Sequence, residues 1–185
     1  MIEKWPVLST RQLADFRIFS VRTDLKRSPR TGAEHDFYVL QARNWVNVIA
    51  LTPDHHLVMV EQYRHGSDTI ELEIPGGVLE PGEPSPITGG QRELREETGY
   101  TGDSAELIGQ IFPNPAIMAN TCHTLLVRNA RPTHSVEFDS GEDLRTHLIP
   151  VSELPNLVAS GRIRHALVVV ALYHFDLWQR APSPR

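Results

Sequence analysis

The segment GVLEPGEPSPITGGQRELREETGY, residues 77–100, predicts a glycine-rich turn followed by one capped helix. Ser85 has the hydroxyl group that caps a helix N-terminus, and Pro86 suits the first helical position, where its missing N–H costs nothing. Glycine is the residue type that most often ends a helix, so we expect Gly99 to follow a helix that runs to about Thr98. Gly90, inside the helix, would let it approach the sheet closely.

Three glutamates on the predicted helix share one face. Glu93, Glu96 and Glu97 stand three and four positions apart, so their carboxylates project to the same side and repel one another. A bound cation relieves this repulsion, and carboxylate oxygens suit Mg²⁺ or Mn²⁺ rather than zinc. The competing interpretation is a solvated surface joined by ion pairs, for which Arg92 and Glu96 have the i, i+4 spacing. The helix alone leaves both interpretations open.

On either side of this helix the chain alternates short strands with helices. Strands interleaved with helices predict an α/β sandwich in which a mixed sheet lies between helical layers. We divide the chain into an N-terminal β extension (residues 1–43), one α/β domain (residues 44–180) and a tail (residues 181–185). The expected elements are a hairpin of Phe16–Thr23 and Asp36–Ala42, strands at Val46–Leu51, Leu57–Gln62, Thr69–Ile74, Glu106–Phe112, His123–Asn129 and Leu144–Pro150, and helices at Ser152–Gly161 and His165–Gln179.

The composition excludes several classes of protein. The formal net charge is -5 and no basic stripe is present, so we expect no nucleic-acid binding. Cys122 is the only cysteine, which excludes an intramolecular disulfide and a cysteine-rich zinc site. The first residues lack the apolar core of a signal peptide, and the longest apolar run, Ala166–Tyr173, is too short to span a bilayer. We therefore expect a soluble cytoplasmic protein with no membrane partner.

Residues 77–100 resemble the signature of the Nudix hydrolases. That pattern is Gly, five residues, Glu, seven residues, Arg-Glu, an apolar residue, any residue, Glu-Glu, any residue, Gly and an apolar residue. Here eight residues separate Glu83 from Arg92, and Gly89 and Gly90 each cost roughly 1 kcal/mol relative to alanine in a helix interior. We expect the loop or the first helical turn to absorb the extra residue. The matching positions are Gly77, Glu83, Arg92, Glu93, Leu94, Glu96, Glu97, Gly99 and Tyr100.

Three further segments are similar to the ADP-ribose and nucleotide-sugar pyrophosphatase branch of the Nudix hydrolases. They are Asn44–Val48, Glu61–Gly66 and Glu71–Gly77. The resemblance implies a Nudix-type α/β/α sandwich over residues 44–180 and a homodimer in which the N-terminal hairpin reaches across to the partner. It implies a small-molecule nucleotide sugar as substrate, with ADP-ribose the first candidate. Another diphosphate, such as a dinucleotide or a coenzyme, and a non-catalytic nucleotide-sugar sensor are the alternatives.

The resemblance also implies which residues perform the chemistry. Glu93, Glu96 and Glu97, with the backbone carbonyl of Gly76, would hold Mg²⁺ or Mn²⁺ against the pyrophosphate, and Glu97 would be essential for turnover. Arg92 would orient Glu96 by a charge-assisted hydrogen bond.

The general base is expected on the late acidic loop at residues 137–143. Glu142 is the first candidate and Asp139 the second, against the alternative that this loop is simply a solvated acidic segment.

Three residues are further candidates for substrate binding. Arg64 could contact phosphate through its planar donors or form an ion pair with Glu61 or Glu71. Glu73 lies beside the Gly76 turn and could contact substrate or metal. Trp45, like Trp5, could stack on a nucleobase, although core or interface packing is the commoner role of such a residue.

Overall fold

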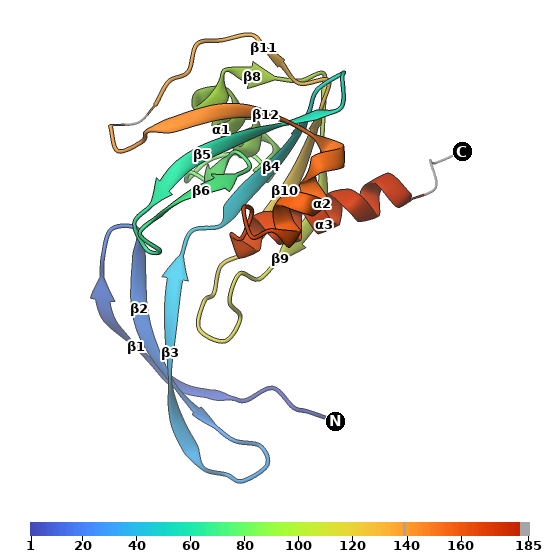
Figure 1. The fold of residues 1–185 in the computed structure, drawn as a ribbon. Helices are drawn as coiled ribbons and strands as arrows, with labels where there is room; N and C mark the ends of the chain where they lie inside the picture. Colours follow the sequence, from blue (N-terminus) through green and yellow to red (C-terminus); the bar gives the residue numbers. More distant parts are fainter. Residues whose placement is uncertain (139, 182–185) are drawn as a thin grey trace. The chain divides into compact units, whose positions relative to one another are not determined.

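The computed structural model describes residues 1–138 and 140–181 and shows a chain that divides into two compact units (Figure 1). The first unit combines Met1–Asn44 with Phe112–Thr121. The second combines Trp45–Ile111 with the chain from Cys122 onward. Each unit has its own sheet.

The first unit is built on a three-stranded antiparallel sheet in the order β1-β2-β3. The predicted hairpin is present as β2 (Phe19–Arg27) and β3 (Glu34–Ala42), and its turn ends at Gly32, whose positive φ of 73° favours glycine. The strand β1 (Val7–Asp15) was not predicted from the sequence. This strand is exposed over almost its whole length, so it carries no alternation of apolar and polar residues from which it could be recognised.

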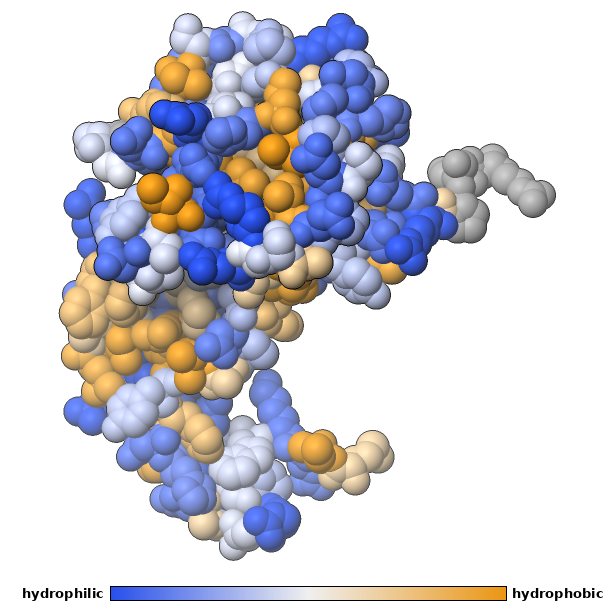
Figure 2. Space-filling model, viewed as in Figure 1, coloured by the Kyte–Doolittle hydropathy of each residue, from blue (hydrophilic) through white to orange (hydrophobic). Residues whose placement is uncertain are grey.

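Aromatic packing and a returning segment complete the first unit. The ring of Trp5 packs edge-on against Phe37 with the ring centroids 5.4 Å apart, so the contacts of Trp5 are those of a packing residue. Leu40 donates its N–H to the carbonyl of Ile117, which ties residues 112–121 to β3. Much apolar surface is left uncovered, and Figure 2 shows hydrophobic side chains gathered over this sheet.

The second unit contains a seven-stranded mixed sheet in the order β12-β5-β4-β10-β9, with β6 paired to β5 and β7 paired to β4. β10 runs parallel to β4, whereas the other pairings are antiparallel. The strands are β4 (Trp45–Leu51), β5 (His56–Arg64), β6 (Thr69–Glu73), β7 (Gly76–Val78), β9 (Ser104–Ile111), β10 (Cys122–Arg128) and β12 (Leu144–Pro150), and a separate pair joins β8 (Tyr100–Thr101) to β11 (Arg131–Pro132).

Helices cover both faces of this sheet, which confirms the predicted sandwich (Figure 1). The helices are α1 (Pro86–Thr98), α2 (Leu154–Ala159), which follows a single 3₁₀ turn, and α3 (Ala166–Arg180). On one face, α1 packs Leu94 against Val48. On the other, α3 packs Phe175 against Ile49. Among the described residues, no helix is long and apolar enough to cross a lipid bilayer.

The ends of α1 are those predicted from the sequence. The Ser85 hydroxyl accepts a hydrogen bond from the Thr88 N–H, and Gly99, with φ of 74°, donates its N–H to the Arg95 carbonyl. A Cβ at Gly90 would lie 2.6 Å from the side chain of Leu125, so only glycine allows the helix to approach the sheet this closely. As a result, the face of α1 that carries the glutamates lies against the turn at Gly76.

Candidate functional site

Two glutamates of α1 lie buried against the β6–β7 turn. Glu93 is 8% exposed and Glu97 is 4% exposed. Glu97 accepts a hydrogen bond from the Gly76 N–H at 3.0 Å. A Cβ at Gly77 would collide with the Glu93 carboxylate, so glycine at this position leaves room for that group, whereas a Cβ at Gly76 would meet the backbone carbonyl of Val46 on β4. The turn and the helix therefore enclose two carboxyls at close range.

Burial makes ionisation of these two carboxyls unfavourable. It raises the pKa of Glu93 to about 7 and that of Glu97 to about 8, and the negative charge of Glu142 adds to both shifts. The Gly76 N–H lowers the pKa of Glu97 but does not offset the burial. The positive charges of Arg92, beside Glu93, and of Arg64, near Glu97, only partly offset the burial, and an added cation would favour the ionised carboxylates further.

Arg92 joins three carboxylates of the signature. Its guanidinium donates to Glu83, Glu93 and Glu96, in each case at 2.9 Å. The hydrogen bond to Glu96 has the geometry that the i, i+4 spacing suggested. Five fixed donors allow one arginine to orient several acidic groups at once.

Glu83 reaches Arg92 although eight residues separate the two in the sequence. The Glu83 carboxylate also accepts the Glu80 N–H, which folds the loop back over the helix. A Cβ at Gly89 would lie 2.6 Å from a carboxylate oxygen of Glu83. Glycine at position 89 therefore leaves room for the Glu83 carboxylate.

The late acidic loop runs beside the second half of α1. The Glu137 N–H donates to the carbonyl of Glu96 at 2.8 Å, which ties the loop to the helix. Glu142 is exposed, and its negative charge raises the pKa of both Glu93 and Glu97, so it lies near enough to act on them electrostatically. The second candidate, Asp139, lies outside the described residues.

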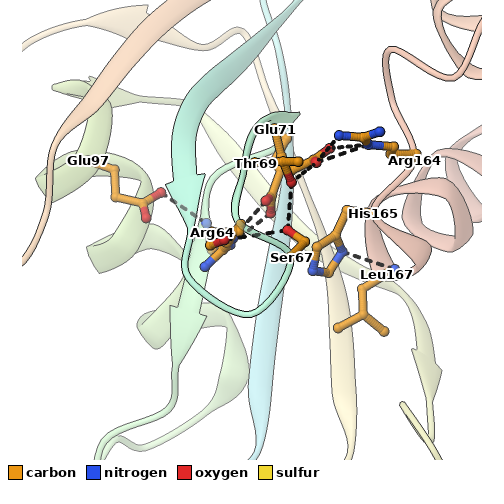
Figure 3. A network of polar contacts seen from close by, with 10 residues as sticks. Arg64, Ser67, Thr69, Glu71, Glu97, Arg164, His165 and Leu167 are labelled. Atoms are coloured by element: carbon orange, nitrogen blue, oxygen red, sulfur yellow. Dashed lines mark hydrogen bonds and ion pairs between the residues drawn. The ribbon is translucent and has the colours of Figure 1, made fainter.

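Arg64, at the end of β5, lies beside the same site (Figure 3). It donates two hydrogen bonds of 2.7 Å to the buried Glu73, and these bonds raise the pKa of Arg64, with a further contribution from the charge of Glu97. Neither Glu61 nor Glu71, the two partners considered from the sequence, is its partner, so that expectation was wrong. Glu61 is three residues away on the same strand and faces the opposite side of the sheet, while Glu71 is bound by Arg164.

Three other residues singled out from the sequence take no part in this cluster of contacts. Trp45 begins β4, where it is half-buried opposite Val78. Cys122 is buried at the start of β10, and burial raises the pKa of its thiol to about 11, so it remains a protonated, apolar group. Trp5 packs within the first unit.

The chemistry of this cluster fits a divalent cation. Carboxylates and a backbone carbonyl are hard oxygen donors, and burial raises the pKa of both carboxyls despite the Arg92 guanidinium beside Glu93. In residues 1–138 and 140–181, no three acidic, histidine or cysteine side chains converge closely enough to hold an ion as they stand. Arg92 holds Glu93 and Glu96 by its own hydrogen bonds, so ion binding requires these side chains to turn toward Glu97.

A polar network next to Arg64 was not predicted from the sequence. Figure 3 shows Arg164 and His165, from the segment before α3, on the side of Arg64 opposite Glu97. Arg164 binds Glu71 through its Nε and Nη2 atoms at 3.0 and 2.8 Å. About ninety residues separate these partners, so no local pattern could have revealed the pair; Glu71, a charged residue in a short strand, was the only signal.

Comparison with known proteins gives the same fold and signature. The NUDIX domain family matches residues 41–170. The methanol dehydrogenase activator of Bacillus methanolicus is 27% identical over 171 residues, which are 92% of this chain and 91% of that protein. The ADP-ribose pyrophosphatase of Bacillus subtilis (strain 168) is 29% identical over 133 residues, which are 71% of each chain.

A solved structure described as an ADP compounds hydrolase has a TM-score of 0.86 at 22% identity and covers 97% of this chain and 96% of its own. At this identity the likeness shows the fold. The domain match covers more than half of the chain and includes the turn, α1 and the acidic loop described above. The chain therefore belongs to the NUDIX domain family.

Proposed function

We propose that the protein is a metal-dependent hydrolase that cleaves the pyrophosphate of a nucleoside diphosphate sugar into a nucleoside monophosphate and a sugar phosphate. The observation that carries this proposal is the pair of buried carboxyls, Glu93 and Glu97, beside the Gly76 turn, with Glu142 and Arg64 near enough to shift the pKa of Glu97. ADP-ribose is the first substrate to test, because one similar protein is named an ADP-ribose pyrophosphatase.

Each group in the proposed site has a distinct task. Glu93, Glu96, Glu97 and the Gly76 carbonyl would hold Mg²⁺ or Mn²⁺. Bound ions of this kind neutralise phosphoryl oxygens and lower the pKa of a bound water. Arg92 orients the acidic side chains through its hydrogen bonds.

The remaining groups act on the reactants. Glu142 accepts the proton of the attacking water, and its exposure and its electrostatic effect on Glu97 support this role. Arg64, fixed by Glu73, presents its remaining N–H groups to a phosphate oxygen. Glu73 is assigned to holding Arg64, and Trp45 is retained as a candidate contact for the nucleobase.

The first experiment incubates the protein with Mg²⁺ and a panel containing ADP-ribose, other nucleoside diphosphate sugars and a dinucleotide, and identifies the products. We expect a nucleoside monophosphate and a sugar phosphate, no reaction in EDTA, and loss of turnover in Glu97→Gln. Glu106→Gln is the matched control, because Glu106 lies on β9 with a side chain 46% exposed. Equal turnover by Glu97→Gln and the wild type would reject the site.

A second experiment tests the general base. We expect Glu142→Gln to lower kcat about 10²- to 10⁴-fold with little change in the Mg²⁺ concentration that gives half-maximal activity. Asp143→Asn changes the neighbouring exposed acid and should retain activity. A loss of activity shared equally by the two variants would assign the effect to the charge of the loop rather than to Glu142.

We also propose that the protein acts as a homodimer, and in the cytoplasm. Uncovered apolar residues of the N-terminal unit support the dimer, among them Phe16 and Ile18 at 55% and 76% exposure. The single, unpaired Cys122 is compatible with a reducing compartment. Ultracentrifugation should find a dimer that Ile18→Glu weakens and Leu177→Glu, on α3, does not; a monomeric wild type would contradict the proposal.

A further inference from the structure

A cavity of about 480 Å³ lies next to Arg64 within the second unit. Its volume is in the range of about 300–1000 Å³ that small-molecule sites occupy. Arg64 lies between this cavity and Glu97 (Figure 3). A substrate bound at the candidate metal site could therefore extend past Arg64 into the cavity. The lining residues are Arg64, Gly66, Ser67, Glu71, Arg164 and His165.

Two arginines of the cavity are held in place by buried carboxylates. Arg64 binds Glu73, and Arg164 binds Glu71. The Glu73 and Glu71 side chains are 3% and 6% exposed, whereas those of Arg64 and Arg164 are 42% and 57% exposed. Each pair uses the Nε and Nη2 atoms of its arginine, so the outer edge of each guanidinium can donate to a ligand. The donors are oriented before any ligand arrives.

His165 and Ser67 add neutral hydrogen-bonding groups. The Leu167 N–H donates to His165 Nδ1 at 3.2 Å, so the neutral imidazole carries its proton on Nε2 and can act as a donor there. The Ser67 hydroxyl lies 2.7 Å from the Thr69 hydroxyl, on the turn between β5 and β6. The lining therefore combines cationic donors, a carboxylate acceptor and a hydroxyl.

We propose that this cavity binds the sugar half of the nucleoside diphosphate sugar. The inference rests on the proposed function and deepens it. Each arginine is matched by one glutamate, so the cavity as a whole is close to neutral and suits hydroxyl groups better than a second phosphate. Its lining contains no phenylalanine, tyrosine or tryptophan ring on which a nucleobase could stack. Arg164, His165 and Ser67 then determine sugar specificity.

The test compares two substrates that share their ADP half. ADP-ribose carries the sugar, whereas the β-methyl ester of ADP replaces the sugar with a methyl group. The variants are Arg164→Lys, which leaves a cation facing Glu71, and His165→Asn and Ser67→Ala, which leave that ion pair untouched. Arg180→Lys is the control, because Arg180 forms an exposed ion pair with Asp176 elsewhere on α3.

We expect Arg164→Lys and His165→Asn each to lower kcat/KM for ADP-ribose about tenfold, mostly through KM, with a smaller loss in Ser67→Ala. The methyl ester should be hydrolysed equally well by all the variants and the wild type, and Arg180→Lys should match the wild type on both substrates. Equal losses on both substrates, or no loss on either, would overturn the sugar subsite while the hydrolase stands. A wild type that hydrolyses neither substrate would overturn the proposed function and the subsite together.

Discussion

Replacing Glu97 with glutamine should stabilise the metal-free protein at pH 8 while it abolishes hydrolysis. Burial raises the pKa of Glu97 from about 4.5 to about 8, so its ionised form is unfavourable in the folded protein. Glutamine has nearly the same shape and no charge, and its carbonyl oxygen can still accept the Gly76 N–H. The Glu97 carboxylate that would bind the cation therefore destabilises the folded protein when no cation is bound.

The size of the effect follows from linkage. Because the folded-state pKa is raised above the unfolded value, the stability from this carboxyl is fully present below about pH 4.5 and is lost as the pH rises through about 8. At pH 8 the loss is on the order of 4 kcal/mol. We expect glutamine to recover about 2–4 kcal/mol there and almost nothing at pH 5, because its buried amide group also needs partners.

Thermal unfolding in EDTA at pH 5 and pH 8 measures this difference. For a chain of this size, 1 kcal/mol corresponds to about 2–4 °C in Tm, so Glu97→Gln should melt roughly 5–15 °C above the wild type at pH 8. The exposed carboxyl variant Glu106→Gln should follow the wild type at both pH values. Adding Mg²⁺ at pH 8 should raise the Tm of the wild type more than that of Glu97→Gln, since only the wild type offers the complete site.

Two results would contradict the raised pKa of Glu97. If Glu97→Gln changed Tm by the same amount at pH 5 and pH 8, the effect would come from packing, and Glu97 would titrate normally in the folded protein. A variant that is less stable than the wild type only at pH 8 would show that the ionised carboxylate is favourable without metal. Either finding would remove the electrostatic argument for a cation bound by Glu93 and Glu97.

Three further predictions concern the packing of Gly89, Gly99 and Cys122. Gly89→Ala should lower the free energy of unfolding by about 1–3 kcal/mol in urea titrations despite the better helix propensity of alanine, because its Cβ would meet the Glu83 carboxylate, while Gly66→Ala, which meets nothing, should be close to neutral. Gly99→Ala should cost about 1 kcal/mol or more, because φ is 74° and a Cβ there collides with a loop carbonyl; an unchanged urea midpoint would contradict this. Cys122 should react with a thiol reagent only on unfolding, and rapid labelling of the native protein would show that its burial is wrong.

Local sequence patterns predicted much of the second unit. The Ser85 cap and the Gly99 stop define α1 because capping depends on residues within a few positions of the helix end. The strand β4 was predictable because its apolar residues are buried on both faces of the sheet. In contrast, β1 is an exposed strand, so its residues carry no periodic pattern, and only the pairing with β2 reveals it.

The acidic helix, its two ends and the shared face of its glutamates could be predicted without a structure. These features depend on the 3.6-residue repeat and on side chains close in the chain. Only the tertiary structure decided that Arg64 binds Glu73, that Gly89 makes room for Glu83, and that Arg164 lines a cavity beside the site. Long charged side chains can reach several partners, and which of them they reach depends on how strands and loops distant in sequence are brought within a few ångströms of one another.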